Sequence, residues 1–125
     1  MANTATLQAS LTFNSPTAVV AQRIFPATNF AVAGDHYLKS IFTVPTSAGG
    51  TAIPLGGVAT AGGLLWIKNN DATNYVQILT ATSGTAFMRL NPGEANLIRL
   101  DAGITAPAAL AHTAAVEIQY LLLDA

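Results

Sequence analysis

Residues 64–100, LLWIKNNDATNYVQILTATSGTAFMRLNPGEANLIRL, show the clearest strand pattern in the chain. This stretch holds four runs of strand length, LLWIK, NYVQILT, AFMRL and NLIRL, separated by the loops NNDAT, ATSGT and NPGEA. Each loop carries residues that favour turns through their backbone or side-chain geometry. This succession predicts a meander of antiparallel hairpins. Within NPGE, Pro92 sets φ at the first central position and Gly93 allows positive φ at the second, which predicts a type II turn.

Outside this stretch, other segments show β-type patterning. Residues 6–14 alternate apolar and polar side chains strictly, which predicts a half-buried strand. Residues 36–44 and 114–124 predict two more strands, the second with apolar residues on both faces near its end. Residues 17–34 predict one or two irregular strands, and the alanine-rich residues 107–115 predict at most one or two turns of helix.

The segment TAIPLGGVATAGG, residues 51–63, is too rich in glycine for a long helix. Its apolar residues Ile53, Leu55 and Val58 are expected to tuck beneath a sheet from an edge segment, where a proline is tolerated.

Short strands with turns at intervals of about 8–12 residues predict an all-β sandwich or barrel. We expect an antiparallel two-sheet sandwich of about eight strands, jelly-roll-like in its topology. Residues 1–125 are expected to form a single β-sandwich domain, in which residues 1–34 are an extended or irregular interaction segment.

The composition indicates contact with another protein. Hydrophobic residues make up 51% of the 125-residue chain and charged residues only 9%, against about 25% charged residues in an ordinary domain. Much of the apolar excess is alanine, which suits flat surfaces that approach closely. The chain has no cysteine, so disulfides and thiolate metal sites are excluded, as fits synthesis in a reducing cytoplasm.

Other classes of partner are not expected. The net charge is −1 and the five cationic residues are scattered singly, which argues against binding a run of phosphates in nucleic acid. The longest apolar runs fall far short of the roughly 20 residues that cross a bilayer, so we expect no membrane span. The first residues lack the pattern of a secretory signal, so we expect no export.

Candidate reactive residues have simpler structural interpretations. Asp71 and Asn74 offer oxygens to calcium, but a single carboxylate makes a weak site, and an Asx-type turn is favoured. His36 and His112 lie in no metal-binding spacing, and adjacent Asp35 and His36 in a strand point to opposite faces. We therefore expect no active site, no metal and no cofactor, and a protein that is not an enzyme.

Aromatic and basic residues leave two further hypotheses. The side chains of Tyr75, Phe87, Trp66 and Tyr120 are candidates for a sugar-binding platform. The favoured alternative places Trp66 in the core, with its indole N–H meeting a carbonyl. The strands that carry Arg89 and Arg99 are expected to pair, so each arginine is expected to find an acidic partner or a neighbouring subunit.

The second half of the chain resembles a known family. TAIPLGGVATAGGLLWIKNNDATNYVQI, then FMRLNPGEANLIRL, and finally AAVEIQYLLLD resemble, in this order, small structural proteins of tailed bacteriophages. Those proteins often carry an IPLG segment, a glycine-led strand ending in KN, a D-A-T-N-Y/F-V hairpin, an L-x-P-G-E turn and an apolar C-terminal strand. The resemblance covers roughly residues 51–124, and residues 1–50 add only compatible alternation.

The resemblance implies a jelly-roll-like virion component, with capsid decoration, or cementing, as its role. Such proteins form homo-oligomers, with trimers favoured over dimers, on the capsid exterior, where they bridge neighbouring major capsid proteins. The resemblance carries over no binding residue. Our hypothesis is that residues 14–34 or the N-terminal strand reach onto a neighbouring subunit or the capsid; undiminished capsid occupancy after deletion of residues 1–14 would contradict it.

Two alternatives stay open. A tail or baseplate adaptor, or a receptor-recognition module of the same viruses that holds a glycan, would use the same fold in a few copies per particle. A cellular carbohydrate-binding domain would bind glycan without any virion.

Overall fold

The computed structural model describes residues 3–8, 10–14, 19–23, 28–32 and 36–124. The chain divides into two compact units, Met1–Ala33 and Gly34–Ala125. Every regular element in the described part of the chain is a β-strand.

The described strands of the first unit form two separate two-stranded antiparallel sheets. Strand β1 (Asn3–Leu7) pairs with β4 (Thr28–Val32), and β2 (Ser10–Asn14) pairs with β3 (Val19–Arg23). The single strand predicted over residues 6–14 is therefore two strands.

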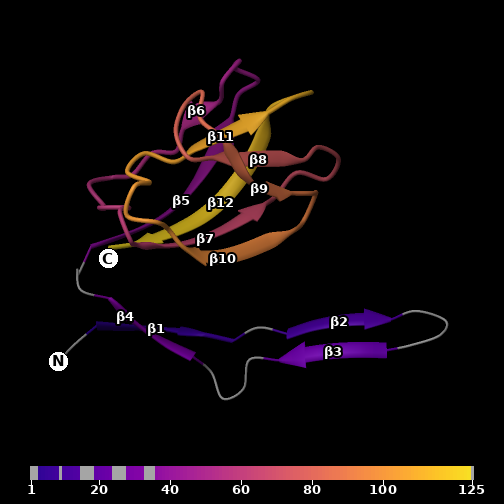
Figure 1. The fold of residues 1–125 in the computed structure, drawn as a ribbon. Coiled ribbons are helices and arrows are strands. Elements are labelled where there is room, and N and C mark those ends of the chain that lie inside the picture. The colour runs from indigo at the N-terminus through magenta and orange to yellow at the C-terminus, as the bar shows by residue number, and fades with distance from the viewer. Residues whose placement is uncertain (1–2, 9, 15–18, 24–27, 33–35, 125) are drawn as a thin grey trace. The chain divides into compact units, whose positions relative to one another are not determined.

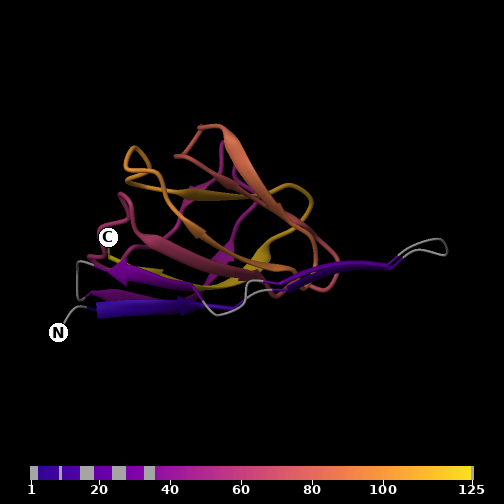
Figure 2. The same cartoon turned by 60° about the horizontal axis from the view of Figure 1, so that its bottom comes forward.

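The second unit is a sandwich of two four-stranded antiparallel sheets, one stacked on the other (Figure 1). One sheet has the order β10-β7-β12-β5 and the other β6-β11-β8-β9. The turned view shows the strands of this unit from another side (Figure 2). The strands are β5 (Tyr37–Val44), β6 (Thr51–Ala52), β7 (Leu64–Asn69), β8 (Val76–Leu79), β9 (Ala86–Leu90), β10 (Ala95–Arg99), β11 (Ala108–Ala111) and β12 (Val116–Leu123).

The pairing is that of a jelly roll. The first of these eight strands pairs with the last (β5 with β12), β6 pairs with β11, β7 with β10, and β8 with β9. These four pairs follow one another along a long antiparallel hairpin, which folds into two facing sheets. Pairing of β12 with β7 completes one sheet, and pairing of β11 with β8 completes the other. The predicted all-β, two-sheet, jelly-roll-like fold is confirmed.

The winding overturns three local predictions. Strands β7 to β10 are not a meander, because only β8 and β9 form a hairpin, whereas β7 pairs with β10 and β12. Strands β9 and β10, which carry Arg89 and Arg99, lie in different sheets and do not pair. The predicted turns of helix in residues 107–115 are replaced by β11, which pairs with β6 on one side and with β8 on the other.

The NPGE turn carries the chain from one sheet to the other. The Glu94 N–H donates to the Asn91 carbonyl at 3.0 Å, and Gly93 has φ of 79°. This is the positive φ that the second central position of a type II turn requires. The predicted turn is confirmed, but it connects β9 to β10 across the sandwich instead of closing a hairpin.

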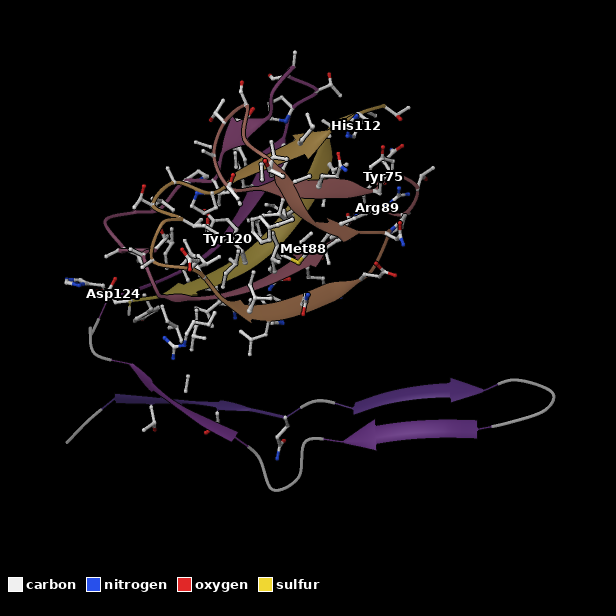
Figure 3. The ribbon with its side chains drawn as sticks, viewed as in Figure 1. Tyr75, Met88, Arg89, His112, Tyr120 and Asp124 are labelled. Atoms are coloured by element: carbon white, nitrogen blue, oxygen red, sulfur yellow. The ribbon has the colours of Figure 1, made fainter. Side chains whose placement is uncertain are left out.

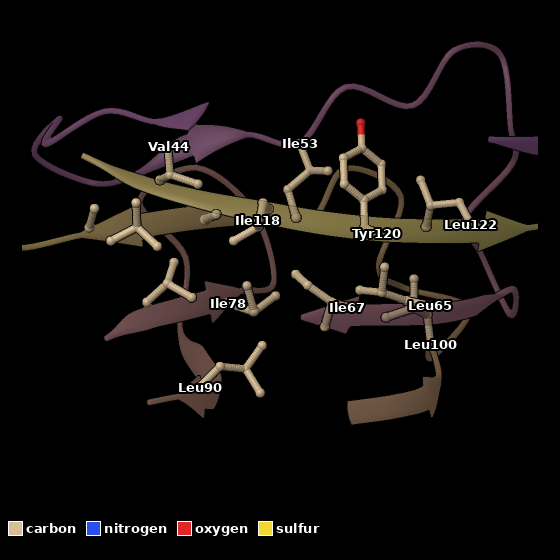
Figure 4. Close-up of a cluster of buried hydrophobic side chains, with 14 of the residues drawn as sticks. Val44, Ile53, Leu65, Ile67, Ile78, Leu90, Leu100, Ile118, Tyr120 and Leu122 are labelled. Atoms are coloured by element: carbon tan, nitrogen blue, oxygen red, sulfur yellow. The ribbon is translucent and has the colours of Figure 1, made fainter. Parts of the chain in front are cut away.

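The core lies between the two sheets. The alternation predicted for the last strand places Val116, Ile118, Tyr120 and Leu122 inward, all at most 1% exposed. Figure 4 shows Ile118, Tyr120 and Leu122 in this core. Ile53 and Val58, from the segment around β6, are buried against them, as predicted. The Tyr120 hydroxyl donates to the Pro54 carbonyl at 2.7 Å, so the ring also ties this segment to the sheet.

Candidate functional site

The polar patch after β7 is a self-contained loop. Asp71 Oδ1 accepts the Thr73 N–H at 2.7 Å and the Asn74 N–H at 2.6 Å, which confirms the predicted Asx turn. Asn69 is fully buried beneath it: its Nδ2 donates to the Asn74 and Leu90 carbonyls and its Oδ1 accepts the Asp71 N–H. The loop uses its side-chain oxygens to hold its own backbone.

The backbone N–H groups of Asn74 and Thr73 also lower the pKa of the Asp71 carboxyl, because they stabilise its charged form. The carboxylate is therefore engaged in the turn. Within the described residues, no three His, Cys, Asp or Glu side chains are grouped closely enough to hold a metal ion.

The aromatic platform that the sequence suggested does not form. Tyr120 is in the core, Trp66 lies half-buried on the outer face of the β10-β7-β12-β5 sheet, and Tyr75 and Phe87 belong to the other sheet region. The placement of Trp66 in the core is also wrong, because its neighbours Leu65 and Ile67 take the inward positions and the side chains of a strand alternate.

Tyr75 instead joins a cluster that the sequence did not indicate. The Arg89 guanidinium carbon lies 3.7 Å from the centroid of the Tyr75 ring, and the His112 ring lies 5.2 Å from it, centroid to centroid. His112 Nε2 is 2.5 Å from Gln77 Oε1. Figure 3 shows Tyr75, Arg89 and His112 gathered at one end of the sandwich.

The other histidine, His36, joins the first and last described residues of the second unit. His36 Nδ1 donates to Asp124 Oδ2 at 2.8 Å, and Asp124 Oδ1 accepts the Ala59 N–H at 2.7 Å. The His36 side chain is 71% exposed. Asp35, the acid that precedes it, lies outside the described residues.

Asp124 makes stability depend on pH. The Ala59 N–H, followed by His36, lowers the pKa of this carboxyl in the folded protein. Below the ordinary Asp pKa of about 4, the Asp124 carboxyl binds a proton more readily in the unfolded chain than in the folded protein. The stabilisation by Asp124 is therefore fully present above pH ~4 and is lost as the pH falls through the pKa of Asp124 in the folded protein. We expect the melting temperature of the wild type to approach that of Asp124→Asn as the pH falls from about 5 to about 2. A constant difference across that range would contradict this role.

The outer face of the β10-β7-β12-β5 sheet exposes apolar side chains. Tyr37 is 71% and Ile41 60% exposed, and both lie on β5, the edge strand. The register places Lys39, Leu121, Trp66 and Leu97 in one row across the sheet beside them. We call Tyr37, Lys39, Ile41, Trp66, Leu97 and Leu121 the outer apolar face.

Comparison with protein-family models, with curated proteins and with solved structures finds no match. Within the described residues, no helix has the length and apolar character needed to cross a membrane.

Proposed function

We propose that this protein is a capsid decoration, or cement, protein that binds the major capsid protein shell of a tailed bacteriophage from the outside. The proposal draws its family from the ordered motifs of residues 51–124 and its physical support from the outer apolar face. In this role the protein is a homo-oligomer, with a trimer favoured, and it carries out no catalysis.

The outer apolar face is the observation that carries the proposal. Large apolar side chains rarely stay exposed together on one face unless another molecule covers them. On this face Tyr37 and Ile41 are more than half exposed, and they lie on a strand held rigidly by its pairing with β12. A protein that clamps a shell needs such a broad, stiff contact surface.

The first unit offers a second contact element. Its described strands form two sheets of two strands each, β1-β4 and β2-β3, and an isolated two-stranded sheet is marginally stable at best in water. The sequence of this unit includes the alternating apolar residues Leu11 and Phe13. We propose that residues 1–34 contact a neighbouring subunit or the capsid.

The composition of purified particles tests the proposal. A decoration protein is present in hundreds of copies, because it repeats over the shell, whereas a tail or baseplate adaptor is present in a few. Glycan binding by the free protein, together with its absence from particles, would favour the carbohydrate-binding alternative.

A further inference from the structure

We propose that the cluster of Arg89, Tyr75, His112 and Gln77 is a docking site for an acidic side chain of a partner protein, whose carboxylate is bound by the Arg89 guanidinium. The cluster lies on the outer face of the β6-β11-β8-β9 sheet, away from the sandwich core. The identity of the partner as the capsid shell protein rests on the proposed function. The preference of the site for a carboxylate does not depend on that function.

The sheet register assembles the cluster. Gln77 pairs with Arg89 on β9 and with Leu110 on β11, so these three residues form one outward row. His112 directly follows the last pair of β11 with β8, Ala111 with Val76, and therefore lies opposite Tyr75 in the next outward row. Two contacts join the rows: the Arg89 guanidinium lies over the Tyr75 ring, and the His112 ring is hydrogen-bonded to Gln77.

The guanidinium is fixed before any ligand arrives. One face lies on the Tyr75 ring, and Nε donates to Asn91 Oδ1 at 3.0 Å. Tyr75 is itself held, because the Asx loop binds both the N–H and the carbonyl of the preceding residue, Asn74. Holding an arginine in place in this way reduces the entropy lost on binding.

The free edge of the guanidinium suits a carboxylate. Among the described residues, none accepts a hydrogen bond from either Nη atom of Arg89, and no carboxylate lies within ion-pair distance of its guanidinium. Glu94, the nearest acid in sequence, turns both oxygens to Asn91, at 2.8 and 3.3 Å. Two parallel N–H groups match the two oxygens of a carboxylate, the strongest form of such a contact.

A neutral sugar fits the cluster less well. Stacking of a sugar requires an open aromatic face, but the Arg89 guanidinium covers one face of Tyr75 at 3.7 Å and the His112 ring packs beside it. The accessible group is the charged edge of Arg89. The cluster therefore favours an anionic group, and its place on a flat sheet favours one carried by a protein surface.

Titration of the full chain with hexaglutamate, followed by NMR, tests the site. We expect saturable shifts of the Arg89 Nε–H and His112 ring signals with hexaglutamate and none with hexaglutamine. Arg89→Gln should weaken the affinity about tenfold or more, because it removes a charge-assisted pair. The matched control is Arg99→Gln, which removes the same charge from an exposed arginine of the other sheet and should bind like the wild type.

Other outcomes would overturn the inference. These are equal affinity of Arg89→Gln and the wild type, tighter binding of trigalacturonate than of hexaglutamate, or self-association by light scattering that Arg89→Gln abolishes.

Binding to capsid shells separates this inference from the proposed function. If the wild type and Arg89→Gln occupy shells equally, the assignment of the shell as acidic partner fails and the decoration role stands. If the wild type does not bind shells, the decoration role fails, and the peptide titration still decides the site.

Discussion

Tyr120→Ala is expected to lower the free energy of unfolding by about 3–5 kcal/mol, the range for removing a large aromatic side chain from a core. Tyr120 is 0% exposed and packs between Ile67 and Ser40, its cross-strand neighbours. The change leaves a cavity and also leaves the Pro54 carbonyl without the hydroxyl that donates to it. Urea unfolding followed by tryptophan fluorescence measures the effect.

Two variants show whether the loss comes from the core. Tyr120→Phe keeps the ring and removes one hydrogen bond, so it should cost about 1 kcal/mol. Trp66→Ala, followed by circular dichroism, should cost less than Tyr120→Ala, because Trp66 is half-buried on the outer face. A larger loss for Trp66→Ala would show that the outer apolar face carries more of the stability than the core does.

Asn69→Asp is expected to be comparably damaging, at about 3–5 kcal/mol near neutral pH, because it buries an uncompensated charge. The two N–H donors of Asn69 point at the Asn74 and Leu90 carbonyls, so a carboxylate would put oxygen against oxygen at 0% exposure. These surroundings should raise the pKa of the new carboxyl. The destabilisation should therefore be greatest at high pH and should shrink as the pH falls and the carboxyl takes up a proton.

Asn96→Asp is the matched control, because Asn96 is exposed on β10, where its Oδ1 accepts the neighbouring Leu97 N–H at 2.8 Å and its Nδ2 donates to Met88 Sδ, a weak acceptor, at 3.4 Å. Its unfolding free energy should stay within about 0.5 kcal/mol of the wild type. If Asn69→Asp were equally mild at pH 8, the buried amide would not be what holds the Asx loop to the sheet.

Local sequence patterns predicted where the strands lie better than they predicted which strands pair. Alternation located β5 and β12, and Pro92-Gly93 identified the type II turn, because both depend on neighbouring residues. The pairing of β7 with β10 and β12 depends on segments far apart in sequence, so a run of four strands was equally compatible with a meander. Strict use of the two-residue period would have placed Trp66 on the face opposite Leu65.

The side-chain contacts that the sequence did not predict are those between residues far apart in the chain. The Asx turn at Asp71 spans adjacent residues and was predicted correctly. The His36–Asp124 pair and the His112–Gln77 contact join residues 88 and 35 positions apart, and no spacing rule indicates them. The alanines of β11 favour helix by intrinsic propensity, but packing between two strands overrides that preference.

The number of copies of this protein in purified particles decides whether it decorates the capsid shell. Quantitative mass spectrometry of intact heads, separated from tails and scaled to the major capsid protein, measures it. Decoration of the shell predicts hundreds of copies in the head fraction, in a fixed ratio to the shell protein. A few copies confined to tails, or none in any particle, would contradict the account.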